Sequence, residues 1–297
     1  MDESSGWVSD KPVVTVDEVL AEESLGGPSE WGSHRWNDLL KCPRFYYYRY
    51  IRRLLPDQRS GEALEFGTII HEMLARRYRK EDPWRILELL DRAGYVGDPL
   101  DEATRVYVDY ETKYGKWDER NETKDPYFNT KRAWIEKPLT AMTSKLTDAK
   151  LTARMDLAYM RTENGLVLVD HKTSKRMSGK LTGGFALDTQ VLTLMLAAIR
   201  DKKFRHLRLL GIEINAIVRT KKVQLSRIRY SYDADLVARY ETNWNRWVAF
   251  LVWASKHDWP MFTNNCLGKF DWPCDYRECC LRNSTYGLIE VPEGVNI

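Results

Sequence analysis

An aspartate and a lysine two positions apart follow a run of apolar residues in the middle of the chain. The segment Leu166–Thr173 reads LVLVDHKT, so Asp170 and Lys172 come directly after a stretch that suits a buried strand. Because successive side chains of a strand point to opposite faces, these two project the same way. Burying such a pair is costly unless something binds it. A divalent cation on Asp170, with Lys172 beside an attacked phosphate, would offset that cost, whereas a strand that simply ends in solvent would need neither.

A second acid lies on the strand predicted before this one. In residues 150–159 the apolar residues alternate as one core face, and Asp156 falls on the other face. The Asn-Gly pair at 164–165 is a strong signal for a hairpin between the two strands. An antiparallel hairpin would bring Asp156 close to Asp170 and Lys172.

A histidine can face the same place from a preceding helix. Residues 62–78 have helical spacing, and Gly67 and His71 lie four positions apart on one side of that helix. The glycine lets a neighbouring backbone come close, and the imidazole faces the same neighbour. A histidine on a helix is more often structural than a metal ligand, so His71 gains weight only from the residues around it.

The segment 41–53 combines cations with aromatic rings. It reads KCPRFYYYRYIRR, with five basic residues, five aromatic residues and no acid. Cations for phosphates and aromatic faces for stacking suit single-stranded nucleic acid. The alternative is an amphipathic helix whose tyrosines pack inward and whose arginines are solvated, and both descriptions can hold on different faces.

Composition describes an ordinary globular protein. The 297 residues are 43% hydrophobic and 30% charged, and the net charge of +3 is too small to predict a polyanionic partner by itself. No apolar run is long enough to span a bilayer, and the acidic, polar start is unlike a secretory signal. Four of the five cysteines crowd into residues 266–280, which is a poor disulfide framework and a plausible thiolate metal site in a reducing cytosol.

The pattern of elements predicts one α/β domain. Residues 1–30 suit a flexible lead-in, a single domain covers 31–283 with a helical insertion at about 81–125, and 284–297 form a tail. Helices are expected from 189 to about 200, with Gln190 in its first turn, and from 233 to about 257. Predicted strands cover 133–139, 150–159, 166–172, 207–218 and 223–232.

Two acids, a lysine and a preceding histidine, in this order, resemble the PD-(D/E)XK nuclease superfamily. The resemblance is to its RecB-like branch of phage and CRISPR-associated exonucleases with a C-terminal cysteine cluster. The chain departs from that branch at Ala153, where glycine is common, and at Leu194, where a tyrosine follows the glutamine. The motifs that carry the resemblance are Cys42-Pro43-Arg44, Gly67 to Glu72, Arg154-Met155-Asp156, Val169 to Thr173, Gln190, and Cys266, Cys274 and Cys280.

This resemblance implies a metal-dependent active site on a mixed, mainly antiparallel central sheet flanked by helices. Mg²⁺ or Mn²⁺ would be held by His71, Asp156 and Asp170. Lys172 would orient or deprotonate water or neutralise the phosphate, and Gln190 would position the substrate or that water. His171 alternates to the other face and is expected to be structural.

The resemblance also implies a cysteine-bound cluster that joins the N- and C-terminal regions, 33–53 and 260–283. Its ligands would be Cys42, Cys266, Cys274 and Cys280, with Cys279 as the spare. A [4Fe–4S] cluster is the family's group, and tetrahedral Zn²⁺ is the alternative for four thiolates.

The function that follows is a DNA exonuclease in a bacterial cytoplasm, encoded by a phage or its host. It would act in recombination, repair or spacer acquisition, with an annealing protein or a helicase as a possible partner and no membrane. A DNA-binding module without turnover, or a structural partner in a recombination complex, is the alternative. The residues expected to touch DNA are Arg44, Tyr48, Arg49 and Arg52.

Overall fold

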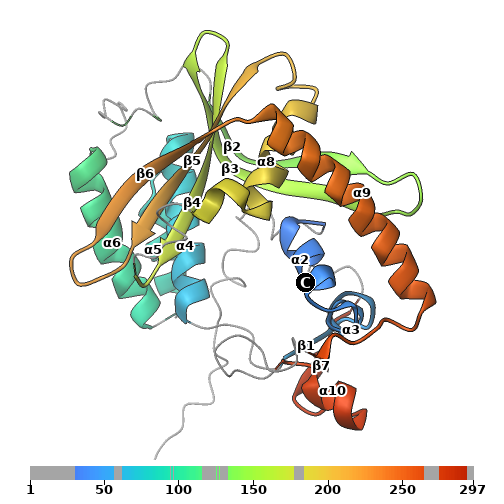
Figure 1. Ribbon diagram of the computed structural model, residues 1–297. Coiled ribbons are helices and arrows are strands. Elements are labelled where there is room, and N and C mark those ends of the chain that lie inside the picture. The colour runs from blue at the N-terminus through green and yellow to red at the C-terminus, as the bar shows by residue number, and fades with distance from the viewer. Residues whose placement is uncertain are drawn as a thin grey trace, which may run out of the picture.

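A five-stranded sheet forms the centre of the computed structural model, which describes residues 31–56, 62–93, 95, 97–115, 125, 127, 133–176, 184–263 and 274–292 (Figure 1). The strands lie in the order β2-β3-β4-β5-β6. Only the β4–β5 pair is parallel, and the other three pairs are antiparallel. The bounds are Ala133–Thr143 for β2, Lys150–Thr162 for β3, Gly165–Ser174 for β4, Arg208–Val218 for β5 and Gln224–Ser231 for β6. The predicted α/β class with a mixed, mainly antiparallel sheet is confirmed.

The parallel pair depends on a helical crossover. After β4 the chain passes through a short 3-10 turn, η2 (Gly184–Leu187), and helix α8 (Thr189–Arg200) before it enters β5. The Asp188 side chain accepts a hydrogen bond from the Gln190 N–H, which satisfies a donor of the first turn and sets where α8 begins. Gln190 therefore lies in the first turn of a capped helix, as the sequence predicts.

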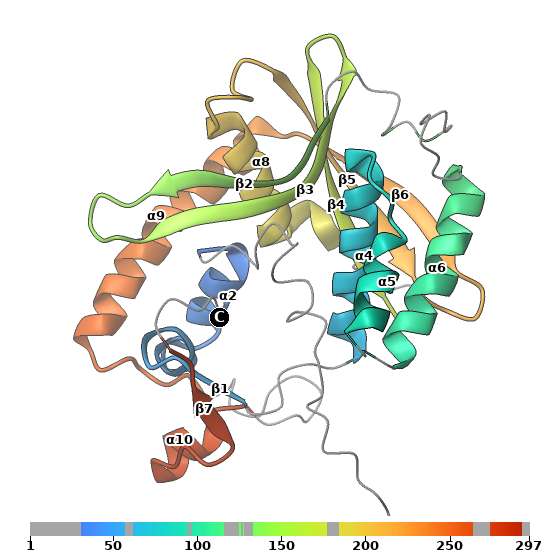
Figure 2. The ribbon, with the colours of Figure 1, turned by 180° about the vertical axis from the view of Figure 1, so that it is seen from behind.

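Helices cover both faces of the sheet. One face packs on α2 (Ser33–Lys41), α8 and the long α9 (Ala234–Lys256), with Trp36 and Trp244 edge to face between them. The other face packs on α4 (Glu62–Arg79), α5 (Arg85–Arg92) and α6 (Asp98–Tyr114), which stand in front of the sheet in Figure 2. No helix within the described ranges is long and apolar enough to cross a membrane.

Segments from the two ends of the described chain form a small separate structure, the terminal module. It contains α3 (Pro43–Tyr46), a π-helical turn η1 (Tyr47–Ile51), α10 (Arg277–Arg282), and strand β1 (Leu54–Pro56) paired with β7 (Leu288–Glu290). The Tyr276 hydroxyl donates to the Leu54 carbonyl at 2.6 Å in its interior. The N-terminal and C-terminal regions that the sequence predicts to be joined do meet here. The predicted lead-in, 1–30, lies outside the described residues.

Behind the sheet, α4 and α6 enclose a buried polar network around Tyr110. Its hydroxyl lies 2.7 Å from that of Tyr78 and accepts from Arg227 at 3.0 Å and from Asn215 at 3.1 Å. Arg227 also donates to Asp125, a fully buried carboxylate, at 2.9 Å and 3.2 Å. These groups are buried in low-dielectric surroundings, where a polar group without a hydrogen-bond partner lowers the stability of the folded protein.

Tyr110→Phe should lower the free energy of unfolding by about 1–3 kcal/mol, because it leaves buried donors without their acceptor. Urea unfolding followed by circular dichroism measures the change. Tyr286→Phe is the matched control, since that ring is 94% exposed and should leave the midpoint unchanged. Equal midpoints for the two variants would contradict the role given to the Tyr110 hydroxyl.

Candidate active site

The two predicted acids lie where β3 and β4 separate. The ladder between these strands ends at the pair Leu157 and Val169, so Asp156 and Asp170 are each one residue beyond it. The Asp156 carboxylate reaches across the gap and accepts the His171 N–H at 2.7 Å. The hairpin predicted from the sequence has thus brought both carboxylates to one fork in the sheet.

Asp170, Lys172 and Gln190 form a closed ring of polar contacts. The Lys172 Nζ lies 2.7 Å from one Asp170 oxygen and donates to the Gln190 Oε1 at 2.9 Å. The Gln190 Nε2 donates to the other Asp170 oxygen at 2.9 Å. Asp170 is only 1% exposed, so the ion pair with Lys172 and the hydrogen bond from Gln190 partly offset the cost of shutting this carboxylate off from water.

His71 and an unpredicted acid, Glu136, complete the site on the other side of Asp156. The Nδ1 of His71 lies 3.7 Å from the Asp156 Oδ2. One ligand atom from each of His71, Glu136 and Asp156 can be chosen so that all three lie within 4.8 Å of one another. This is the spacing expected of groups that share one ion. Asp170, which is predicted to bind the same ion, is not a member of this group.

Glu136 occupies an irregular point in the sheet. It lies opposite Asp156 between the paired residues of β2 and β3, and its φ of 48° is rare for a residue with a side chain. Its carboxylate pairs with Arg154 at 2.7 Å. The alternation of β3 also changes here, because Met155 faces the core under α8 whereas Leu157 faces the core under α4. The single core face expected along residues 150–159 is therefore wrong.

Burial and neighbouring charges set the protonation of these groups. Burial raises the pKa of Glu136 to about 8, and the nearby Asp156 carboxylate adds to the effect. Burial also raises the pKa of Asp170, although Lys172 opposes it. For Asp156 burial is outweighed by His71 and by the His171 N–H, so its pKa is lowered. Burial lowers the pKa of His171 to about 3, so this imidazole stays neutral.

His171 packs on the face away from the ring, as predicted. Its Nδ1 is 2.9 Å from the Asn215 amide nitrogen, which in turn donates to Tyr110. The buried network behind the sheet therefore holds the side chain of the residue whose N–H binds Asp156.

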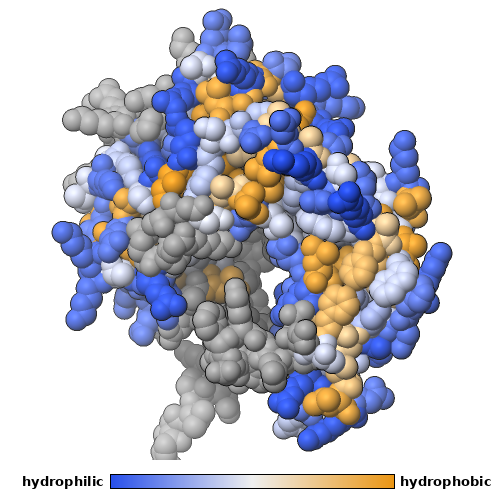
Figure 3. All heavy atoms as spheres, viewed as in Figure 1, coloured by the Kyte–Doolittle hydropathy of each residue, from blue (hydrophilic) through white to orange (hydrophobic). Residues whose placement is uncertain are grey.

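The predicted DNA-contacting segment is largely engaged within the protein. Arg44 pairs with Asp258 at 3.1 Å, and Tyr48 packs on Tyr276. Arg49 lies 3.8 Å from Asp38. Hydrophobic side chains gather over the lower part of α9 (Figure 3). In that helix Phe250 stacks on Trp253, and it also stacks on Phe262. Arg52 is exposed. The contacts with DNA predicted for these residues stay predictions.

Three of the cysteines meet in the terminal module. Cys42 and Cys279 are buried in one small core with Phe45 and Tyr276, and Cys274 packs against it. The Phe262 N–H donates to the Cys42 sulfur at 3.4 Å, and the Cys279 thiol donates to the Ser284 carbonyl at 3.1 Å. Cys280 is half-buried, and Cys266 lies outside the described residues.

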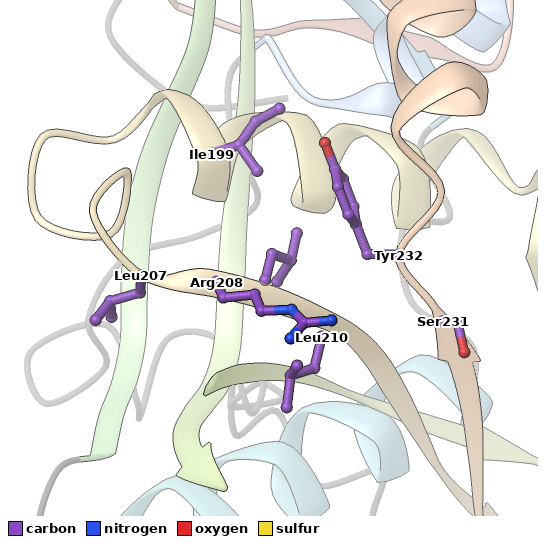
Figure 4. Close-up of a pocket in the computed structure, with 7 residues that line it drawn as sticks. Ile199, Leu207, Arg208, Leu210, Ser231 and Tyr232 are labelled. Atoms are coloured by element: carbon purple, nitrogen blue, oxygen red, sulfur yellow. The ribbon is translucent and has the colours of Figure 1, made fainter. Parts of the chain in front are cut away.

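A cavity of about 550 Å³ lies elsewhere, at the other end of β5 (Figure 4). Ile199, Arg208 and Tyr232 are among the residues that line it, and no predicted site residue does. A smaller cavity of about 70 Å³ adjoins the site, and Gln190, Arg154 and Leu194 contribute to its wall. Leu194 thus lies beside the site without offering the polar group that the resemblance implies.

The order of these elements and residues agrees with one known family. A model of the PD-(D/E)XK nuclease superfamily matches residues 31–281. The chain belongs to this superfamily. The matched range contains every residue of the site described above, and membership supports a nuclease function with DNA as the substrate class. No curated protein matches the chain in sequence.

Two solved structures are similar to this PD-(D/E)XK nuclease. A candidate exonuclease from Eubacterium rectale is 12% identical, with a TM-score of 0.48 over 74% of this chain and 80% of its own. SSO0001 is 14% identical, with a TM-score of 0.33 over 77% of this chain and 81% of its own. At these scores neither likeness adds to the assignment, which comes from the family model.

Lys172→Met should destabilise the metal-free protein by about 3 kcal/mol, because it leaves the Asp170 carboxylate buried without its cation. Adding Asp170→Asn should recover most of that loss. Urea unfolding in EDTA measures both. Lys137→Met is the matched control, since it breaks a more exposed pair with Asp201 and should cost less than about 1 kcal/mol. Equal costs for the two lysines would contradict a buried ring.

Proposed function

We propose that this protein is a metal-dependent DNA exonuclease whose active site is the fork between β3 and β4. One observation carries the proposal: Asp156, Asp170 and Lys172 converge there with Gln190 and His71. Imidazole nitrogen and carboxylate oxygen together suit Mn²⁺, and carboxylates with retained water suit Mg²⁺. The residues present thus fit the cation that the family uses.

His71 and Asp156 would hold the cation, with Asp170 as the further predicted ligand. When bound, such an ion offsets the charge that builds on phosphate oxygens and makes water more acidic. Asp170 and Gln190 hold the Lys172 ammonium in place. From there it can neutralise a phosphate oxygen or take part in proton transfer. Gln190 fixes that ammonium and can orient the attacking water.

The wild-type protein should degrade DNA only with Mg²⁺ or Mn²⁺, and EDTA should stop it. Asp170→Asn and Lys172→Met should each lower the rate at least about a hundredfold. The first removes a proposed ligand of the cation and the second removes the ammonium, and both groups would offset the negative charge that builds on the phosphate. Duplex and single-stranded DNA labelled separately at each end measure the loss. Asp233→Asn, at the N-cap of α9, is the matched control and should retain activity.

The outcomes separate the alternatives. Shortening from an end supports an exonuclease, whereas internal fragments would make the enzyme an endonuclease. DNA binding without any metal-dependent loss would favour the module without turnover. A recombination, repair or spacer-acquisition role would be supported if an annealing protein or a helicase stimulates digestion.

We further propose that Cys42, Cys266, Cys274 and Cys280 bind a [4Fe–4S] cluster in the terminal module. Its support is the meeting of Cys42 and Cys274 in one small core, together with the N–H that Phe262 directs at the Cys42 sulfur. Hydrogen bonds to sulfur are one way in which proteins tune such clusters. Cys279 donates its thiol proton to a carbonyl, which suits a cysteine that is not a ligand.

Protein purified without oxygen should be brown and contain about four iron atoms per chain. Cys42→Ser should remove the colour and lower the stability, and Cys279→Ser is the matched control that should keep the colour. Visible absorbance and iron analysis are the measurements. A colourless protein with one zinc per chain would contradict the iron–sulfur cluster and favour the zinc alternative.

A further inference from the structure

We propose that Glu136 is a ligand of the catalytic cation, together with His71 and Asp156. The inference rests on the proposed nuclease function and adds to it a carboxylate from the first strand of the sheet. The motif residues of the sequence do not include it.

Three possible ligands converge from separate parts of the chain. His71 comes from α4, Glu136 from β2 and Asp156 from β3, yet their ligand atoms lie within 4.8 Å of one another. Three donors on three separate elements offer one ion a preformed pocket. Of the described residues, only these three His, Cys, Asp or Glu side chains form such a group.

Asp170 contacts Lys172 and Gln190, whereas Asp156 and Glu136 lie beside His71. One Asp170 oxygen accepts the Gln190 amide at 2.9 Å, and the other, which is buried without a hydrogen-bond partner, pairs with the Lys172 ammonium at 2.7 Å. Asp170 can therefore still offer an oxygen to the cation, as proposed above. Glu136 would add a further carboxylate beside Asp156 and His71.

The backbone conformation that places Glu136 there is an unusual one. Of the non-glycine residues in the described strands of the large sheet, it alone has a positive φ, and it breaks the alternation next to Asp156. Such a conformation persists only where the surroundings impose it, and it is frequent at functional sites. Here it directs a carboxylate at a second carboxylate, which is unfavourable unless a positive charge lies between them.

Arg154 offers the competing explanation. Its Nε pairs with Glu136 at 2.7 Å, so Glu136 could serve only as the partner of this guanidinium. The neighbouring acid, Glu72, already has Arg76 and Arg79 at 3.4 Å and 3.6 Å. The two roles predict different effects of removing Arg154. If Glu136 serves only the ion pair, loss of Arg154 should have the same effect as loss of Glu136. If Glu136 binds the cation, its carboxylate remains able to do so without Arg154.

The test is Mn²⁺ binding to the full chain, measured by electron paramagnetic resonance without DNA. Glu136→Gln should weaken binding at least about tenfold, as should Asp156→Asn and His71→Ala. Arg154→Gln should leave binding as tight as in the wild type or tighter. Glu102→Gln is the matched control, because it removes a carboxylate paired with Arg219 outside the site and should not change binding.

Each other outcome counts against the proposal in a distinct way. Normal binding in Glu136→Gln, with weak binding in Asp156→Asn, would overturn the role of Glu136 and leave the nuclease site intact. Equal loss in Glu136→Gln and Arg154→Gln would assign Glu136 to the ion pair. Unchanged binding in Asp156→Asn and His71→Ala would remove the cation site itself. If Glu136→Gln does not fold, Glu136→Asp keeps the charge but withdraws the carboxylate, and wild-type affinity there would overturn the proposal.

Discussion

The buried carboxylate of Asp170 is the constraint on which the rest of the structure depends. It is shut off from water, so a cation and an amide must be brought to it from elsewhere in the chain. The lysine comes from the same strand, but the amide comes from the first turn of α8. The crossover helix that follows β4 and leads into its parallel partner, β5, is the element that supplies this amide.

Much of this arrangement follows from local sequence patterns. An apolar run fixed β4, an Asn-Gly turn fixed the hairpin with β3, and Asp188 marked the start of α8. Each of these signals spans only a few residues, and together they place Asp156, Asp170, Lys172 and Gln190 at the same fork. The family model that covers residues 31–281 agrees with the resemblance carried by those motifs.

Other parts depend on contacts that no short pattern reveals. Glu136 is one acid among many until the β2–β3 register places it opposite Asp156, and its positive φ has no signature such as glycine. The switch of β3 between two cores follows from that same irregularity, so strict alternation gave the wrong face for Leu157. The burial of Cys279 and the pairing of Arg44 with Asp258 likewise arise from contacts between distant segments.

Helix α6 lies in the region predicted from the sequence to be a helical insertion, yet it supports a residue of the candidate site. Through Tyr110 and Asn215 it reaches the imidazole of His171, the residue whose backbone binds Asp156. Replacing α6 by an unrelated helix would therefore remove the Tyr110 hydroxyl and, with it, a support of the residue whose N–H binds Asp156. Chimeras between relatives should accordingly exchange α6 together with β5, the strand that carries Asn215.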